Sequence, residues 1–234
     1  MRLRAIALVV PLALALAGCS QMPGVAAAAG TAPRPDQLVD FKALYATNCQ
    51  ACHGANGHGG PAMELGNPEY QALVDDATLK KTISQGMPGT EMPAFAQSAG
   101  GMLTNAQVDA IVAGMRKEWA KAGVFGGEIP PPYAQPAGGD AKRGEQVYQA
   151  RCASCHENAA REQVSSAAYL SLVSDQVLRT VIVAGRKDIG QPDWRLQGVK
   201  GSTGPLSGQD VTDVVTYLGS LRNPGAVSAA PVGR

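Results

Sequence analysis

Two stretches decide the fold of this chain: Cys49-Gln50-Ala51-Cys52-His53 and Cys152-Ala153-Ser154-Cys155-His156. Both follow the pattern Cys-x-x-Cys-His. On a helix, residues three apart lie on one side of a single turn, so the two thiols of each stretch can reach one edge of a planar ligand. The histidine that follows is then placed beneath the centre of that ligand. The two stretches therefore predict two equivalent binding sites.

Three other uses of paired cysteines fit the sequence less well. A zinc ribbon places its second pair about 15–20 residues after the first, but residues 53–151 separate these pairs. A thioredoxin-like dithiol needs a strand before the motif, whereas the residues before each motif have helical spacing. Structural disulfides give no reason for the two histidines. The pattern therefore predicts two covalently bound haem c groups, with thioether bonds and histidine ligands from Cys49, Cys52, His53, Cys152, Cys155 and His156.

The two motifs belong to an internal repeat with an offset of 99 residues. A short helix is expected before each motif, with Tyr45 or Tyr148 four residues before the first cysteine. The chain is therefore predicted to be a tandem duplication. The residues that recur at helical spacing are Tyr70, Leu73, Val74, Asp76, Leu79, Ile83 and Gly86, which match Tyr169, Leu172, Val173, Asp175, Leu178, Ile182 and Gly185.

A longer amphipathic helix is expected near the end of each copy. Thr104 with Gln107, and Ser207 with Asp210, are typical helix start signals. Apolar residues then recur with the period of an α-helix, and no segment shows the alternation typical of a strand. We therefore expect an all-α fold. The apolar positions of the two helices are Val108, Ile111, Val112, Met115 and Trp119, and Val211, Val214, Val215 and Leu218.

Composition divides the chain into segments. Residues 123–139 are rich in glycine and contain three consecutive prolines, so they cannot form the interior of a helix or a strand and are predicted to be a linker. We expect two small helical domains, at residues 36–122 and 140–222. A flexible tether at residues 19–35 and a polar tail at residues 223–234 flank them.

The first 18 residues have the features of an export signal. Two arginines precede an apolar run of 13 residues, Ala5 to Ala17. As a helix this run would be roughly 20 Å long, too short for a hydrocarbon core of ~30 Å. It ends in Leu16-Ala17-Gly18-Cys19, which resembles the bacterial lipoprotein cleavage box. Residues 1–18 are therefore predicted to be a lipoprotein signal peptide, with lipidated Cys19 anchoring the protein on the periplasmic side of a bacterial membrane.

The overall composition excludes one class of function. The net charge is +1 and 17% of the residues are charged. No segment concentrates the lysines and arginines needed to neutralise a row of phosphates, so nucleic acid is not an expected partner.

Each half of the chain resembles a class I cytochrome c domain, and together the halves are similar to bacterial dihaem c-type cytochromes. The resemblance covers about 170 of the 234 residues. It implies two tandem domains of three to four helices, each around one haem. The segment Cys52 to Pro61 is similar to the family's loop, whose proline carbonyl accepts the proton on the other nitrogen of the ligand histidine. The resemblance gives this role to Pro61 and His53.

In this family the second iron ligand is a methionine on a loop before the last helix. The segment Gly86 to Phe95 resembles that loop and implies Met92 as the ligand, with Met87 as the alternative. We expect the remaining candidates in this half to have other roles: Met63 and Met102 in the pocket or on the surface, Met115 in the core, and His58 as a solvated loop residue.

The second half departs from the family pattern at this position. The repeat offset carries Met92 to Gln191 and Phe95 to Trp194, and no methionine follows Met115. Gln191 is the first candidate for the distal ligand of the second iron. Lys187 or Lys200 could ligate instead, or the position could be vacant.

The resemblance implies an electron carrier rather than an enzyme. The expected function is transfer of single electrons, in a respiratory or photosynthetic chain, between a quinol-oxidising complex and a terminal acceptor such as an oxidase or reductase. The alternative is a small dihaem oxidoreductase, such as a peroxidase, acting at an open second haem. It rests on the missing methionine of the second half.

Overall fold

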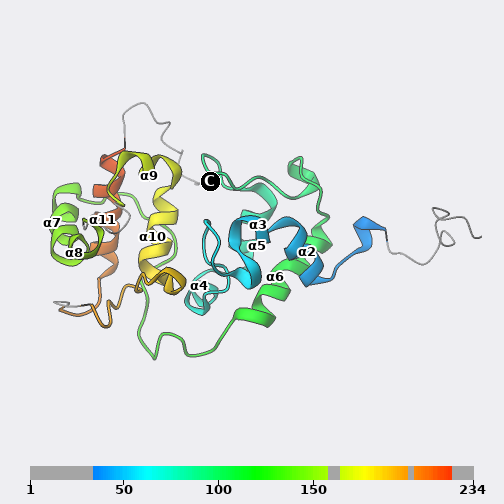
Figure 1. The fold of residues 1–234 in the computed structure, drawn as a ribbon, viewed down its shortest axis with the longest axis horizontal. Helices are drawn as coiled ribbons and strands as arrows, with labels where there is room; N and C mark the ends of the chain where they lie inside the picture. The colour runs from blue at the N-terminus through cyan, green and yellow to red at the C-terminus, as the bar shows by residue number, and fades with distance from the viewer. Residues whose placement is uncertain (1–33, 158–163, 200–202, 223–234) are drawn as a thin grey trace, which may run out of the picture. The chain divides into compact units, whose positions relative to one another are not determined.

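A computed structural model describes residues 34–157, 164–199 and 203–222 of the chain. Within these ranges the backbone is helical and contains no β-strand, only two isolated β-bridges (Figure 1). The prediction of an all-α fold is confirmed. The predicted signal peptide, Cys19, Lys200 and the predicted tail lie outside the described residues.

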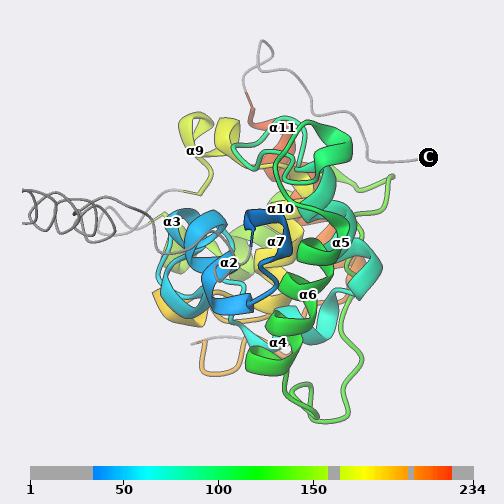
Figure 2. The ribbon, with the colours of Figure 1, turned by 90° about the vertical axis from the view of Figure 1, so that its right-hand side faces the viewer.

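Residues 36–122, called here the first half, contain one long helix and several short ones. The last helix, α6, packs against both α2 and α5, and Figures 1 and 2 show these helices side by side. The helices of this half are α2 (Phe41–Asn48), α3 (Gln50–His53), α4 (Pro68–Leu73), α5 (Asp76–Gln85) and α6 (Asn105–Trp119), with short 3₁₀ turns η2 (Pro35–Gln37), η3 (Ala55–Gly57) and η4 (Gln97–Ala99).

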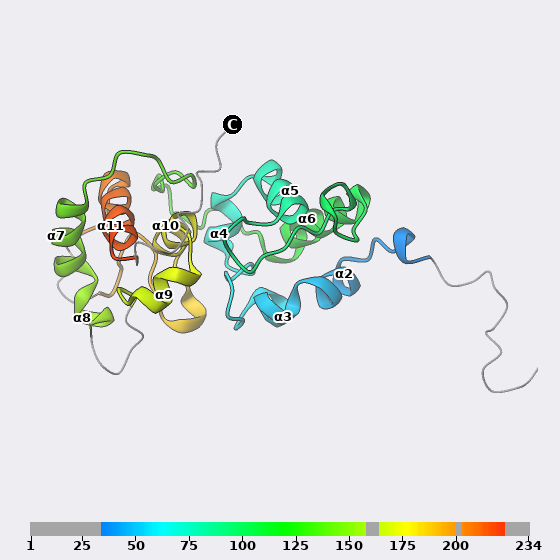
Figure 3. The ribbon, with the colours of Figure 1, turned by 90° about the horizontal axis from the view of Figure 1, so that it is seen from above.

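Residues 140–222, the second half, repeat this order. The first and last helices, α7 and α11, are packed together, as Figures 1 and 3 both show. The short helices α9 and α10 begin 99 residues after α4 and α5. The elements of this half are α7 (Ala141–Arg151), α8 (Ala153–His156), α9 (Ala167–Leu172), α10 (Asp175–Ala184), η5 (Lys187–Ile189) and α11 (Gly208–Ser220).

The long helices begin where the sequence predicts. Thr104 and Ser207 are the N-caps of α6 and α11, and each forms a capping box with the residue three positions later. Both helices bury their apolar face. Val108, Ile111, Val112 and Met115 are at most 3% exposed, as are Val211, Val214, Val215 and Leu218.

Each half joins its last helix to the turn between two short helices through an arginine. In the first half, Arg116 donates to the carboxylate of Asp76 and to the carbonyls of Gln71 and Val74. In the second half, Arg222 donates to the equivalent carboxylate, Asp175, and to the carbonyls of residues 170 and 173. An arginine therefore makes the same kinds of contact in both halves, although Arg222 lies just after α11 and is not at the repeat position of Arg116.

The first and last helices cross closely in both halves, but the glycine that permits this lies on opposite partners. In the first half, a Cβ on Gly114 of α6 would lie 2.1 Å from the ring of Phe41 in α2. In the second half, a Cβ on Gly144 of α7 would lie 2.0 Å from the carbonyl oxygen of Asp213 in α11. Only glycine allows this spacing without a shift of the neighbours.

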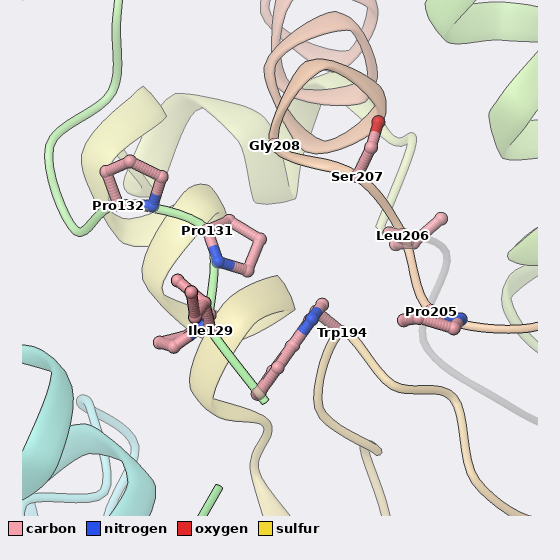
Figure 4. Close-up of a pocket in the computed structure, with 9 residues that line it drawn as sticks. Ile129, Pro131, Pro132, Trp194, Pro205, Leu206, Ser207 and Gly208 are labelled. Carbon is pink, nitrogen blue, oxygen red and sulfur yellow. The ribbon is translucent and has the colours of Figure 1, made fainter. Parts of the chain in front are cut away.

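The segment at residues 123–139, here called the linker, contains neither helix nor strand. It packs on the second half, where the ring of Phe125 lies 5.4 Å from that of Trp194 and Arg179 donates to the carbonyl of Pro132. A cleft of about 400 Å³ lies between the linker and the start of α11 (Figure 4). Linker prolines and Trp194 line this cleft, and none of the Cys-x-x-Cys-His residues does.

Candidate haem-binding sites

The two Cys-x-x-Cys-His stretches have the same backbone. Each follows a helix whose tyrosine carbonyl, Tyr45 or Tyr148, accepts a hydrogen bond from the first cysteine. That cysteine ends the helix with φ of −120° in the first half and −123° in the second. The amides of the second cysteine and of the histidine then both donate to the first cysteine's carbonyl. Each motif therefore forms one helical turn, as the spacing predicts.

All four motif cysteines are free thiols. Burial raises the pKa of the Cys49 and Cys152 thiols to about 11, so both are protonated at neutral pH in the apo-protein. Metal sites use the thiolate. In the described part of the chain, no group of three or more Cys, His, Asp or Glu side chains could hold a metal ion. The cysteine pairs thus do not converge on a zinc site.

The ring of His53 is fixed by a backbone carbonyl, but not by the one that the resemblance implies. Its Nδ1 lies 2.7 Å from the carbonyl oxygen of Met63, whereas Pro61 is exposed. The expectation for Pro61 is wrong. The loop is turned by glycines at positive φ and by a hydrogen bond from Ala62 to the Cys52 carbonyl, so the chain reaches Nδ1 two residues later. The proton on Nδ1 leaves Nε2 free as an iron ligand.

The surroundings of His53 favour its neutral form. The side chain is buried, and this burial lowers its pKa below the ordinary value, against the hydrogen bond to Met63 and together with the nearby charge of Arg186. A neutral imidazole is the form that binds a metal.

The loop after α5 carries Met92 between two glycine turns. Gly86 adopts φ of +68°, and the amide of Met87 donates to the carbonyl of Met92 at 3.0 Å. The Met92 side chain packs against the core of the first half. Met115 is 1% exposed and lies in the core as expected, while Met102 is 82% exposed on the surface.

His58 lies in the loop after the first motif, as expected, but it has a partner. Its Nδ1 is 2.7 Å from Oε1 of the buried Glu64. The side chain is 47% exposed.

The loop of the second half begins with the same glycine turn and has Gln191 in the place of Met92. Gly185 adopts φ of +77°, and the amide of Arg186 donates to the carbonyl of Gln191 at 2.9 Å. The side chain of Gln191 reaches the second motif, with Oε1 at 3.1 Å from His156 Nε2. Its Nε2 donates to the carbonyl of Pro192, so the amide oxygen is the atom that faces the histidine.

Lys187, the other candidate within the described residues, is engaged elsewhere. Its ammonium group forms an ion pair with Glu69 of the first half. The structure thus brings Gln191, and not Lys187, to the imidazole nitrogen that would bind iron.

The residues present fit haem c. Each motif offers two free thiols and one imidazole on a single turn. The Gln191 amide reaches the second imidazole, and Met92, on the corresponding loop of the first half, offers a thioether. Residues 36–113 match the family model "Cytochrome C oxidase, cbb3-type, subunit III", and residues 141–222 match the model "Cytochrome c".

The chain consists of two tandem cytochrome c domains.

Known proteins resemble parts of this tandem cytochrome c. Dihydro-heme d1 dehydrogenase of Pseudomonas aeruginosa is 40% identical over 90 residues, which are 38% of this chain and 16% of that protein. Cbb3-type cytochrome c oxidase subunit CcoP of Azospirillum sp. (strain B510) is 28% identical over 138 residues, 51% of this chain and 39% of the relative. The chain therefore spans less than half the length of either relative.

Among solved structures, the KustC0563 c-type cytochrome is 28% identical. It aligns with 35% of this tandem cytochrome c and 99% of its own length, with a TM-score of 0.30. None of the described helices is long and apolar enough to cross a membrane.

Sequence reasoning missed the residues that join the two halves of this tandem cytochrome c. Arg186 and Asp188 of the second half contact the loop after the first motif. No motif marks them, and their partners lie more than 120 residues away in the sequence. The only signal is that Arg186 follows Gly185, where the first half has Met87 after Gly86.

Proposed function

We propose that this protein is an exported, lipid-anchored dihaem cytochrome c that carries single electrons between a quinol-oxidising complex and a terminal oxidase or reductase. Cys49, Cys52 and His53 would hold the first haem with Met92, and Cys152, Cys155 and His156 would hold the second with Gln191. Bound haem c would supply the one-electron Fe(III)/Fe(II) couple.

The observation that carries this proposal is that the two motifs form the same helical turn, whereas the side chains proposed as distal ligands differ, Met92 in one half and Gln191 in the other. A thioether is a soft ligand and favours ferrous iron, while an amide oxygen is harder and favours ferric iron. The protein therefore provides two sites of different potential in one chain. An electron carrier between a low-potential donor and a higher-potential acceptor uses such a pair as successive steps.

The test uses the mature protein in membrane vesicles. Quinol and a quinol-oxidising complex should reduce both haems, and a terminal oxidase should then reoxidise them within one turnover, as followed by haem absorbance. If electrons pass from quinol to the oxidase at the same rate in vesicles with and without the protein, the proposal is contradicted.

The anchor is tested separately. A diacylated Cys19 carries two chains, and two are needed for stable attachment. The wild-type protein should therefore resist a high-salt wash of the membranes, whereas Cys19→Ala should be released into the soluble fraction. Wild-type protein that washes off with salt would contradict the lipid anchor.

One observation favours a second candidate, an oxidoreductase acting at the second haem. Gln191 would be a weaker ligand than methionine and easier for a substrate to displace. The dihydro-heme d1 dehydrogenase that resembles part of this chain is a protein of that class by its name. Turnover of peroxide that depends on the protein and is abolished by Gln191→Met would favour the oxidoreductase over the carrier.

A further inference from the structure

The two halves meet through residues 59–69 of the first half and residues 184–195 of the second, here called the junction. Both halves belong to one compact unit that begins at Val39. Helices α4 and α10 pack against each other at the junction, and Figures 1 and 3 show them adjacent. The side-chain amide of Asn67, which is 1% exposed, donates to the carbonyls of Ala184 and Gly185.

Arg186 is the central side chain of the junction. Its guanidinium donates to the carbonyl of Ala62 at 2.8 Å and to that of Gly60 at 3.1 Å. It also forms a bidentate pair with Asp188, with both contacts at 2.8 Å. Asp188 in turn accepts from the amide of Gly59 at 3.2 Å. Both side chains are only 9% exposed, so solvent screens this pair little.

Arg186 touches the surroundings of both candidate haems. On one side, the carbonyl of Ala62 that it binds precedes Met63, whose own carbonyl holds His53. On the other side, the Arg186 backbone is paired with Gln191 by two hydrogen bonds of 2.9 Å. Gln191 faces His156. Hydrogen bonds, joined by the covalent structure of Ala62-Met63, Arg186 and Gln191, therefore connect the first imidazole to the second.

We propose that Arg186 is a positioning residue that couples the two haem sites: its charge raises the potential of the first haem, and its guanidinium fork fixes the Arg186 backbone, which is hydrogen-bonded to Gln191 at the second. The proposal rests on the proposed function, because it takes His53 and Gln191 as residues at the two irons. A buried positive charge near a haem disfavours the ferric state and raises the potential. The planar fork of arginine fixes geometry in a way that lysine cannot.

The charge is tested by substitutions of opposite sign in the full-length dihaem protein. Arg186→Gln should lower the potential of the first haem, and Asp188→Asn should raise it. Each change should be about three- to tenfold in the reduction equilibrium constant, or roughly 30–60 mV for one electron. Spectroelectrochemical titration measures both haems in the same sample.

The positioning role is tested by carbon monoxide binding to the second haem. Arg186→Lys keeps the charge and loses the fork, so the first potential should stay at its wild-type value while carbon monoxide associates at least about threefold faster. Arg222→Gln is the matched control, because Arg222 also binds a carboxylate and carbonyls of the second half but does not contact the junction. It should change neither readout.

Three results would overturn the proposal. In the first, Arg186→Gln and Asp188→Asn shift the potential of the first haem in the same direction, because such a result indicates a general loss of structure. The second is carbon monoxide binding at the wild-type rate in Arg186→Lys. The third is an equal change in Arg222→Gln. Gln191→Met separates this proposal from the proposed function: if it leaves the second haem's spectrum unchanged, the ligand assignment fails, while the opposite shifts at the first haem still test Arg186.

Discussion

The distal loops of the two halves share two backbone features and differ in the side chain at the distal position. In both loops a glycine at positive φ ends the preceding helix, and the next amide donates to the carbonyl of the distal residue, Met92 or Gln191. A loop that is fixed by its own backbone can exchange its distal side chain without refolding. The comparison teaches that the potential of each haem could be changed separately within one duplicated fold.

The chain leaves the two motifs in different ways. Gly54 follows His53 with φ of +77°, and a Cβ there would lie 1.8 Å from the carbonyl oxygen of His58. In the second half the residue after His156 is Glu157, with φ of −100°. The glycine turn that opens the loop carrying the Met63 carbonyl therefore has no counterpart at Glu157.

The largest expected effect is the loss of the haem from one half while the other half keeps its haem. Cys52→Ala and Cys155→Ala each remove one thioether bond, so each should lose or severely deplete one of two haems. Haem staining after denaturing electrophoresis, together with the haem-to-protein ratio, measures the loss. Full retention of haem in both variants would contradict covalent attachment at these motifs.

Met92→Gln should make the first site resemble the second. If the lost preference for ferrous iron is about 2–4 kcal/mol, the first potential should fall by roughly 90–170 mV. The second potential should move far less. A potentiometric titration checks this, and an unchanged first potential would show that Met87 or another group ligates the first iron.

The helix crossings can be compared by placing alanine at each glycine. Gly144→Ala puts a methyl group against the backbone of Asp213, while Gly114→Ala puts one against the side chain of Phe41, at the first residue of α2, where the end of the helix can shift with the ring. Overpacking costs about 1–3 kcal/mol, and the helix propensity of alanine offsets about 1 kcal/mol of this. Urea unfolding should therefore show a larger loss for Gly144→Ala. Equal losses would mean that α7 can shift as readily as the phenylalanine ring.

The smallest effect concerns the pH dependence of the junction. The hydrogen bond from Arg186 is the main cause that lowers the pKa of Asp188 from 3.8 to about 2. Because the pKa of Asp188 is lower in the folded state, ionised Asp188 stabilises the folded protein fully above pH 3.8. This contribution is lost as the pH falls through about 2. The unfolding free energies of wild type and Asp188→Asn should differ by on the order of 2 kcal/mol at pH 6 and converge in acid. A difference that does not change with pH would contradict an ionic junction.

Local features of this molecule could be predicted from the sequence, and long-range ones could not. The capping boxes at Thr104 and Ser207, the buried helix faces and the motif turns depend on residues within a few positions of one another. The alignment of Gln191 with Met92 was accessible because the repeat keeps its register.

The predictions that failed or were missing concern features that depend on the path of a loop or on contacts between residues far apart in the sequence. The partner of His53 shifted from Pro61 to Met63 because the glycine loop sets the chain's path, which residue identity alone does not specify. Equivalent residues also differ: Leu73 packs against the core of the second half, whereas Leu172 is 67% exposed. The repeat predicts the two leucines to be equivalent, but only Leu73 packs against the cores of both halves.

The central claim is that the two haem sites differ because of Gln191, and one titration tests it most directly. Spectroelectrochemistry of the wild-type protein and of Gln191→Met should be followed together with the spin state of each haem. We expect two wild-type waves separated by roughly 90–170 mV, with the lower one partly high-spin, and a raised, low-spin second wave in Gln191→Met. Two indistinguishable low-spin haems that the substitution leaves unaffected would contradict it.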